Sequence, residues 1–188
     1  MTSSDFLKSL IQDVDDLTER TTVNIAHLDL EYLNWRPEKD KWSTAEVYAH
    51  LNSYCDHYFP KFEKAIQTSS HLNHSITPNY KSTWLGRYFI RSMSPEKIHK
   101  KFKAPQQHNH LNSQISKDVV NVFLENQKQL KTIIQNSNSI NINKAKVQIE
   151  ILPFLKLRLG DFLKFFVTHQ QRHLVQIMNN EAQRKENG

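Results

Sequence analysis

The segment GDFLKFFVTHQQRHLVQI (residues 160–177) decides the fold. Its apolar residues return at three- and four-residue steps, which is the spacing of one face of an α-helix. The side chains expected on this broad inward face are Phe162, Phe165, Phe166, His169, His173, Leu174 and Ile177. The pattern predicts a long amphipathic helix from about residue 160 to about residue 183, with two histidines on its buried side.

Three further segments show the same helical spacing, at about residues 4–28, 43–66 and 116–134. The second begins at the clearest start signal in the sequence, where Ser43 is followed three residues later by Glu46. This spacing allows a capping box, in which each side chain bonds the backbone amide of the other residue. Pro60 lies inside the second segment and is expected to bend it. The chain therefore contains four predicted long helices.

The remaining segments are less regular. Residues 68–113 read as a long loop or as a functional lid, interrupted by a short helix over residues 84–93. The apolar side chains of that short helix are expected to face inward, and they are Trp84, Leu85, Tyr88 and Phe89. Residues 145–159 are apolar but contain Pro153, which favours an extended crossing over the helices.

Four amphipathic helices joined by polar connections predict an all-α four-helix bundle formed as a single domain over residues 1–188. The chain has only 3 glycines, fewer than a sheet with many tight turns or a phosphate-binding loop usually needs. The two longest connections allow a topology other than simple up-and-down.

The composition of the chain argues against several classes of function. The formal charge is +6, but the basic residues are spread along the chain. The densest run, Lys97, Lys100, Lys101 and Lys103, is typical of a solvated basic face, so nucleic-acid binding is not expected as the main function. The single cysteine, Cys55, excludes an internal disulfide and is interpreted as a packing residue. No apolar run approaches a membrane span or a secretory signal, so we expect a cytoplasmic protein without membrane partners.

His169 and His173 are four residues apart within the helix predicted over residues 160–183. This spacing places both imidazoles on one face, where they can reach one metal ion. The best third ligand is His50, one helical turn from Val47 and Tyr54 on the inward face of the second predicted helix. His57, further along the same helix, is the second choice for the third ligand, and His27 is a weaker one. The alternative is that the histidines only pack or hydrogen-bond between helices.

The histidine pair does not match two better-known helical metal motifs. A zincin protease has glutamate directly after the first histidine, whereas this chain has Gln170. A di-iron carboxylate bundle needs Glu-x-x-His on two helices, and no carboxylate lies beside the histidines of the last helix. Three neutral imidazoles would leave a bound ion its full charge, so that it could lower the pKa of a bound water or thiol.

Two stretches, DKWSTAEVYAHL (residues 40–51) and the segment at residues 160–177, resemble the DinB-like family, named for damage-inducible protein B. This family includes metal-dependent thiol transferases of the bacillithiol type. The resemblance implies an up-down-down-up bundle, a zinc or nickel site on His50, His169 and His173, and frequently a homodimer. Residues 72–112 match no part of the family that can be placed, and substrate selection is expected there.

The leading hypothesis is a metal-dependent thiol transferase or hydrolase acting on a small electrophilic substrate, with a low-molecular-weight thiol as a further candidate cofactor. Tyr54 and His57 are the candidate proton-transfer residues, chosen by the helix face they share with His50. Arg172 is interpreted as a structural residue and Trp42 as a packing residue. The alternative from another class is a non-catalytic, stress-associated or interaction protein, in which the ion is structural or absent.

Overall fold

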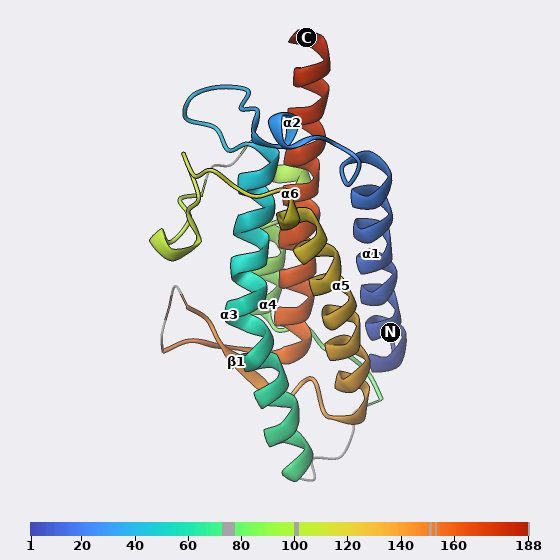
Figure 1. Cartoon of the computed structure of the whole chain (residues 1–188). Helices are drawn as coiled ribbons and strands as arrows, with labels where there is room; N and C mark the ends of the chain where they lie inside the picture. The colour runs from blue at the N-terminus through green and yellow to red at the C-terminus, as the bar shows by residue number, and fades with distance from the viewer. Residues whose placement is uncertain (73–77, 100–101, 151, 153, 188) are drawn as a thin grey trace.

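The structure of the chain is a computed structural model that describes residues 1–72, 78–99, 102–150, 152 and 154–187. Within these residues the chain is mostly helical, as predicted (Figure 1). The long helices are α1 (Ser3–Asn24), α3 (Thr44–His71), α5 (Asp118–Asn136) and α6 (Leu159–Asn187). The short helices are α2 (Leu30–Asn34) and α4 (Trp84–Ser92), with single 3₁₀ turns at η1 (Pro95–Lys97), η2 (Gln106–His108) and η3 (Ser137–Ser139). The all-α prediction is confirmed.

The four long helices lie side by side, with α1 and α6 running in one direction and α3 and α5 in the other (Figure 1). Polar contacts between the helices follow this arrangement. The start of α3 meets the end of α6 where Thr44 Oγ1 donates to Glu181 Oε1 at 3.3 Å. The start of α3 also lies beside the start of α5, where Asn52 Nδ2 donates to the carbonyl oxygen of Val119 at 2.9 Å. These directions bring the middle of α3 against the middle of α6.

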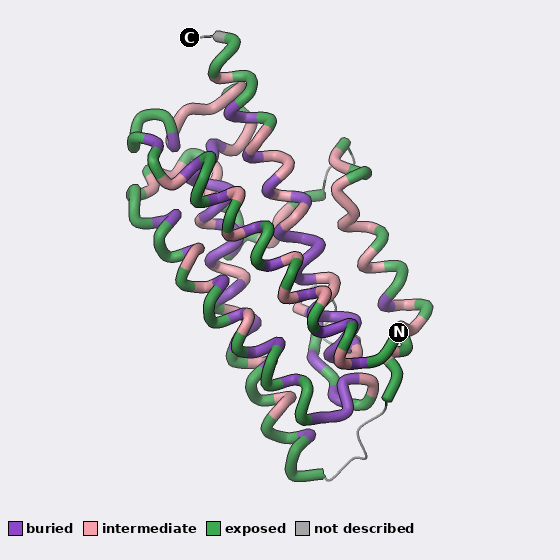
Figure 2. The backbone as a smooth tube through the Cα atoms, turned by 90° about the vertical axis from the view of Figure 1, so that its right-hand side faces the viewer, coloured by how far each residue is buried: buried purple, intermediate pink, exposed green. Residues whose placement is uncertain are grey.

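Apolar side chains fill the space between the helices, and Figure 2 shows the buried positions along the inner sides of the helices. The larger cluster contains a ladder of aromatic rings from α3 and α6, including Tyr58, Phe62, Phe162 and Phe166. Cys55 is buried in the same cluster, and burial raises the pKa of its thiol. The aromatic ladder fixes how α3 and α6 face each other.

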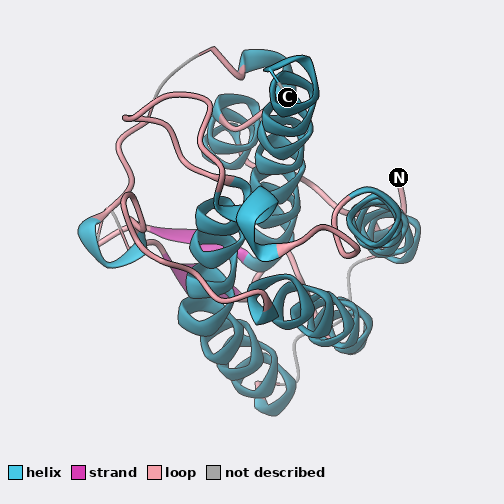
Figure 3. Cartoon of the chain, turned by 45° about the horizontal axis from the view of Figure 1, so that its top comes forward, coloured by secondary structure: helices cyan, strands magenta, loops and turns pink. Residues whose placement is uncertain are grey.

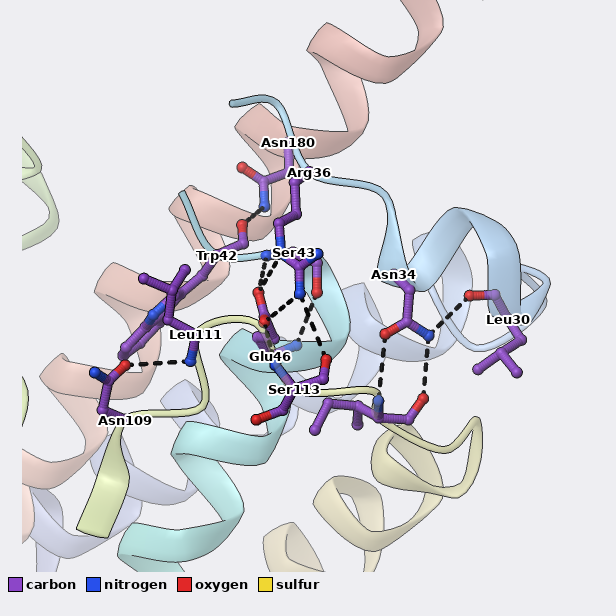
Figure 4. A network of polar contacts seen from close by, with 11 residues as sticks. Leu30, Asn34, Arg36, Trp42, Ser43, Glu46, Asn109, Leu111, Ser113 and Asn180 are labelled. Carbon is purple, nitrogen blue, oxygen red and sulfur yellow. Dashed lines mark hydrogen bonds and ion pairs between the residues drawn. The ribbon is translucent and has the colours of Figure 1, made fainter. Parts of the chain in front are cut away.

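The capping box predicted at the start of α3 is present. Ser43 Oγ accepts from the Glu46 amide at 3.1 Å, and Glu46 Oε2 accepts from the Ser43 amide at 2.8 Å. Glu46 also receives hydrogen bonds from Arg36 Nη2 at 2.6 Å and from the Ser113 amide at 3.1 Å (Figure 4). The fully buried carboxylate therefore holds the connections before α3 and before α5 against the same helix end.

The helix boundaries differ from the prediction by about four residues or more at three places, one of which is the end of α6, at Asn187 rather than about residue 183. The first helix ends at Asn24 and is followed by the separate helix α2, rather than continuing to residue 28. Helix α3 continues to His71 instead of ending near residue 66, with Pro60 inside it. Its last turns continue to pack on the core through Ala65 and Ile66, and tertiary packing of this kind outweighs the helix-breaking tendency of proline.

The extended segment predicted before the last helix contains two short strands, which form a paired ribbon rather than a simple crossing. Strands β1 (Lys146–Gln148) and β2 (Lys156–Arg158) pair antiparallel, with Val147 opposite Leu157. Both of these central side chains point into the core. The ribbon lies beside the helices (Figure 3). Pro153, which was expected to prevent a helix in this segment, falls outside the described residues.

The prediction for the short helix is wrong in one respect. Trp84 is 73% exposed and Tyr88 is 62% exposed, whereas Leu85 and Phe89 pack against the core. Helix α4 faces α6 with Gly86, which lies directly against the Asp161 side chain. Residues 84 and 88 are turned by about 100° from residues 85 and 89, which carries them into solvent. Among the described residues, the structure has no helix long and apolar enough to cross a membrane.

Candidate metal centre

The structure brings His50 of α3 together with His169 and His173 of α6. His50 Nε2 lies 3.4 Å from His169 Nε2, and His173 Nε2 lies 3.0 Å from His169 Nε2. One ring nitrogen from each of the three residues falls within 4.8 Å of the other two. The three predicted ligands therefore converge on one point between the two antiparallel helices.

Hydrogen bonds behind the rings determine which nitrogen faces that point. His50 Nδ1 donates to the carbonyl oxygen of His108 at 2.7 Å, and His173 Nδ1 donates to Gln176 Oε1 at 3.0 Å. Since a carbonyl oxygen only accepts, each Nδ1 carries the ring hydrogen and each Nε2 presents a lone pair. Metal-binding histidines are commonly oriented in this way by an oxygen behind the ring.

The spacing and the charge state of the three rings both suit a divalent ion. A tetrahedral ion with nitrogen bonds of zinc length has ligand atoms about 3.4 Å apart, close to the two measured separations. Burial lowers the pKa of His50 and of His169 well below the ordinary value, with the neighbouring histidines adding to the effect. Burial also lowers the pKa of His173 to about 4. All three rings are thus neutral near pH 7, the form that binds a metal.

A cavity of about 700 Å³ opens onto the three histidines. Trp42 forms part of its wall, with its ring 4.6 Å from the His50 ring and 6.1 Å from the His173 ring. The described residues add no other histidine, cysteine or carboxylate to the three-histidine group. An ion held there would keep a position open toward the cavity, which is the arrangement of a catalytic site rather than a closed structural one.

Tyr54 lies at the same cavity and touches the ligands. Its ring is 4.9 Å from the His50 ring and 5.1 Å from the His169 ring, and it stacks on His108 at 3.9 Å. Burial raises the pKa of Tyr54, so its hydroxyl keeps its proton and can act as a donor.

The other candidate histidines lie elsewhere. His57 belongs to a second group with His108 and Glu150 and does not line the cavity. His27 is part of neither group. His57 therefore lies on the same helix as His50 but outside the three-histidine group.

Arg172 braces the cavity wall from between the two ligands of α6. Its Nη1 donates to the carbonyl oxygen of Lys97 at 2.7 Å, and its Nη2 donates to that of Ile98 at 3.1 Å. Ile98 lines the cavity, so these bonds hold the wall in place. The contacts agree with the structural role predicted for this arginine.

His108 is a site residue that sequence reasoning missed. It lies in η2, within the segment that showed no periodicity, and its side chain is buried. Its backbone carbonyl orients His50, while its ring meets Ser53 Oγ at 2.8 Å and Glu150 Oε2 at 2.9 Å. The only sequence signal was the presence of histidines in an otherwise irregular stretch.

Comparison with known proteins bears on this arrangement. The model of the DinB superfamily matches residues 14–177, a span that contains His50, His169 and His173. No curated protein and no solved structure gives a match. Because the matched span covers most of the chain, the chain belongs to the DinB superfamily.

Proposed function

We propose that this chain is a divalent-metal-dependent enzyme that transfers a thiol to a small electrophilic substrate or hydrolyses such a substrate. The observation that carries the proposal is the convergence of three Nε2 atoms, from His50, His169 and His173, beneath a cavity. Membership of the DinB superfamily supports a metal-binding role. The resemblance further suggests an up-down-down-up bundle and a homodimer, which we include in the proposal.

The metal would be zinc or nickel, since neutral imidazole suits both. When bound, such an ion would lower the pKa of a thiol or water at its open position. The protein orients the His50 ring through His108 and the His173 ring through Gln176. It also shields one side of the site with the Trp42 ring.

Tyr54 is the proposed proton-transfer residue, because its protonated hydroxyl belongs to the wall of the cavity. His57, the second residue proposed for proton transfer, does not line the cavity, and neither does its neighbour His108. It would have to act through His108 and then Tyr54, whose ring stacks on His108 at the cavity wall. The volume of about 700 Å³ holds more than a water molecule and is large enough for a small organic substrate. Thiol transfer is the first activity to test.

The test uses zinc- and nickel-loaded protein with a panel of low-molecular-weight thiols and a chromogenic chloronitrobenzene as the electrophile. We expect metal-dependent consumption of thiol and electrophile in equal amounts, lost on chelation and in His169→Ala. His27→Ala is the matched control, because His27 lies outside both histidine groups. Metal-loaded wild-type protein that reacts no faster than free metal would contradict the proposal. Metal retained without turnover of any thiol or hydrolysable ester would favour the non-catalytic alternative.

A further inference from the structure

A second group of metal-ligating side chains lies next to the first. His57 comes from α3, His108 from η2 and Glu150 from the loop after β1, and one ligand atom from each falls within 4.8 Å of the others. Glu150 Oε2 is 2.9 Å from His108 Nε2 and 3.7 Å from His57 Nε2. No residue of this group is a ligand of the three-histidine centre.

The donor set is chemically competent. Two imidazoles and one carboxylate form the ligand set of many zinc hydrolases and of non-haem iron sites. The two measured separations lie on either side of the roughly 3.4 Å expected between ligands of one tetrahedral ion. The side chains of His108 and Glu150 are only 3% and 13% exposed, so a bound ion would be largely removed from competing water.

The hydrogen bonds behind His108 leave its Nε2 directed at the carboxylate. Ser53 Oγ donates to the backbone carbonyl of His50 at 2.8 Å and lies 2.8 Å from His108 Nδ1. A hydroxyl has one hydrogen, so while Ser53 donates to that carbonyl it accepts from His108 Nδ1. When His108 is neutral, its Nε2 and Glu150 Oε2 then face each other as two acceptors, and either a proton on Nε2 or a metal ion between them satisfies both.

Lys61 competes with a metal ion for this position. Its ammonium group contacts His57 Nε2, on the lone pair that a metal would use. Lys61 lies one helical turn after His57 and is partly exposed, so its long side chain can turn out to solvent. An entering metal ion would replace one cation with another of higher charge.

We propose that His57, His108 and Glu150 form a second site for a divalent transition metal. The two sites are joined through His108, whose side chain binds the second ion and whose backbone carbonyl orients His50 of the first. Because the second site shares no ligand with the three-histidine centre, it does not depend on the proposed activity.

The test is a titration of the full-length His169→Ala chain with zinc alone, against a chromophoric chelator. Removing His169 disables the first centre, so any remaining specific site is the second one. We expect about one equivalent of zinc to bind, with affinity reduced at least tenfold by the added substitution Glu150→Gln. Glu125→Gln, an exposed glutamate of α5, is the matched control and should leave binding unchanged. Lys61→Met should tighten binding several-fold, because it removes the competing ammonium.

A second ligand variant separates binding from folding. His57→Gln changes a partly exposed side chain and should abolish the zinc equivalent while the melting temperature stays close to that of its parent. The proposal is overturned if His169→Ala binds no zinc, or if zinc binding is indifferent to Glu150→Gln and Lys61→Met. In that case Glu150 only holds His108 in place through a hydrogen bond.

Discussion

His50 Nδ1 donates to the backbone carbonyl of His108 at 2.7 Å, across 58 positions of sequence. A ligand on the regular helix α3 is therefore oriented by an irregular segment. Two hydrogen bonds hold that segment in place. One joins the His108 side chain to Glu150, and in the other the Ser113 amide donates to Glu46. The long connection before α5 thus supports the candidate metal centre and is more than a simple link between helices.

Gln176 orients His173 in the same way, so removing its oxygen should weaken metal binding without unfolding the chain. We expect Gln176→Leu to raise the zinc dissociation constant about 10- to 100-fold. Gln171→Leu on the same helix is the matched control, and competition with a chelator measures both. Equal affinity in the two variants would mean that Gln176 does not support the ligand.

Tyr54→Phe tests proton transfer while keeping the aromatic contacts with His50 and His108. In a thiol-transfer or hydrolysis assay, the turnover rate should fall roughly 10²-fold, with zinc affinity unchanged. Tyr88→Phe, at an exposed tyrosine, should keep wild-type turnover. A Tyr54→Phe variant as fast as the wild type would remove Tyr54 from the mechanism.

Glu46 makes the stability of the fold pH-dependent. Burial raises the pKa of Glu46, but the hydrogen bonds from Arg36 and from the Ser43 and Ser113 amides outweigh it and lower the pKa below 4.5. The Glu46 carboxylate therefore stabilises the fold fully at pH values above its pKa in the unfolded chain. This stabilisation is lost as the pH falls through its lower pKa in the folded chain.

Glu46→Gln should reduce the free energy of unfolding by about 2–3 kcal/mol at pH 7. The difference from the wild type should shrink below about pH 4.5, because the wild-type carboxylate becomes protonated. Urea unfolding at several pH values measures it. A difference that stays constant down to pH 3 would show that the charge of Glu46 is not what stabilises this end of α3.

Gly86 allows α4 to approach α6. A Cβ atom at this position would lie 2.2 Å from Cγ of Asp161, whose carboxylate is held by Tyr80 and Thr83. Gly86→Ala should therefore destabilise the chain by about 1–3 kcal/mol, despite the better helix propensity of alanine. Arg91→Ala on the same helix is the control. A stabilised Gly86→Ala variant would contradict the close packing described.

The sequence predicted the parts of the molecule that follow a helical period. The four long helices, the Ser43–Glu46 capping box and the shared face of His169 and His173 all depend on residues three or four apart. The choice of His50, 119 positions from His169, depended instead on the inward face of its own helix and on the family resemblance. Exposure on α4 was mispredicted because two adjacent apolar pairs on a short helix do not reveal which pair faces the core. The neighbour that decides it, Asp161, is far away in sequence.

The supporting residues of the site could not be predicted in this way. His108 and Glu150 lie in segments without periodicity, and their roles depend on backbone carbonyls and on contacts between distant segments. A hydrogen bond to a main-chain oxygen leaves no residue-type signature in the sequence. Only the folded chain shows that these residues stand behind His50.

The zinc content of the reconstituted, untagged protein after removal of unbound metal tests the central claim most directly. His50→Ala, His169→Ala and His173→Ala should each retain about one equivalent less than the wild type, while His27→Ala retains the wild-type amount. This difference holds whether or not the second site is filled. Wild-type protein that retains no zinc, or three variants that retain as much as the wild type, would contradict the assignment of these histidines as metal ligands.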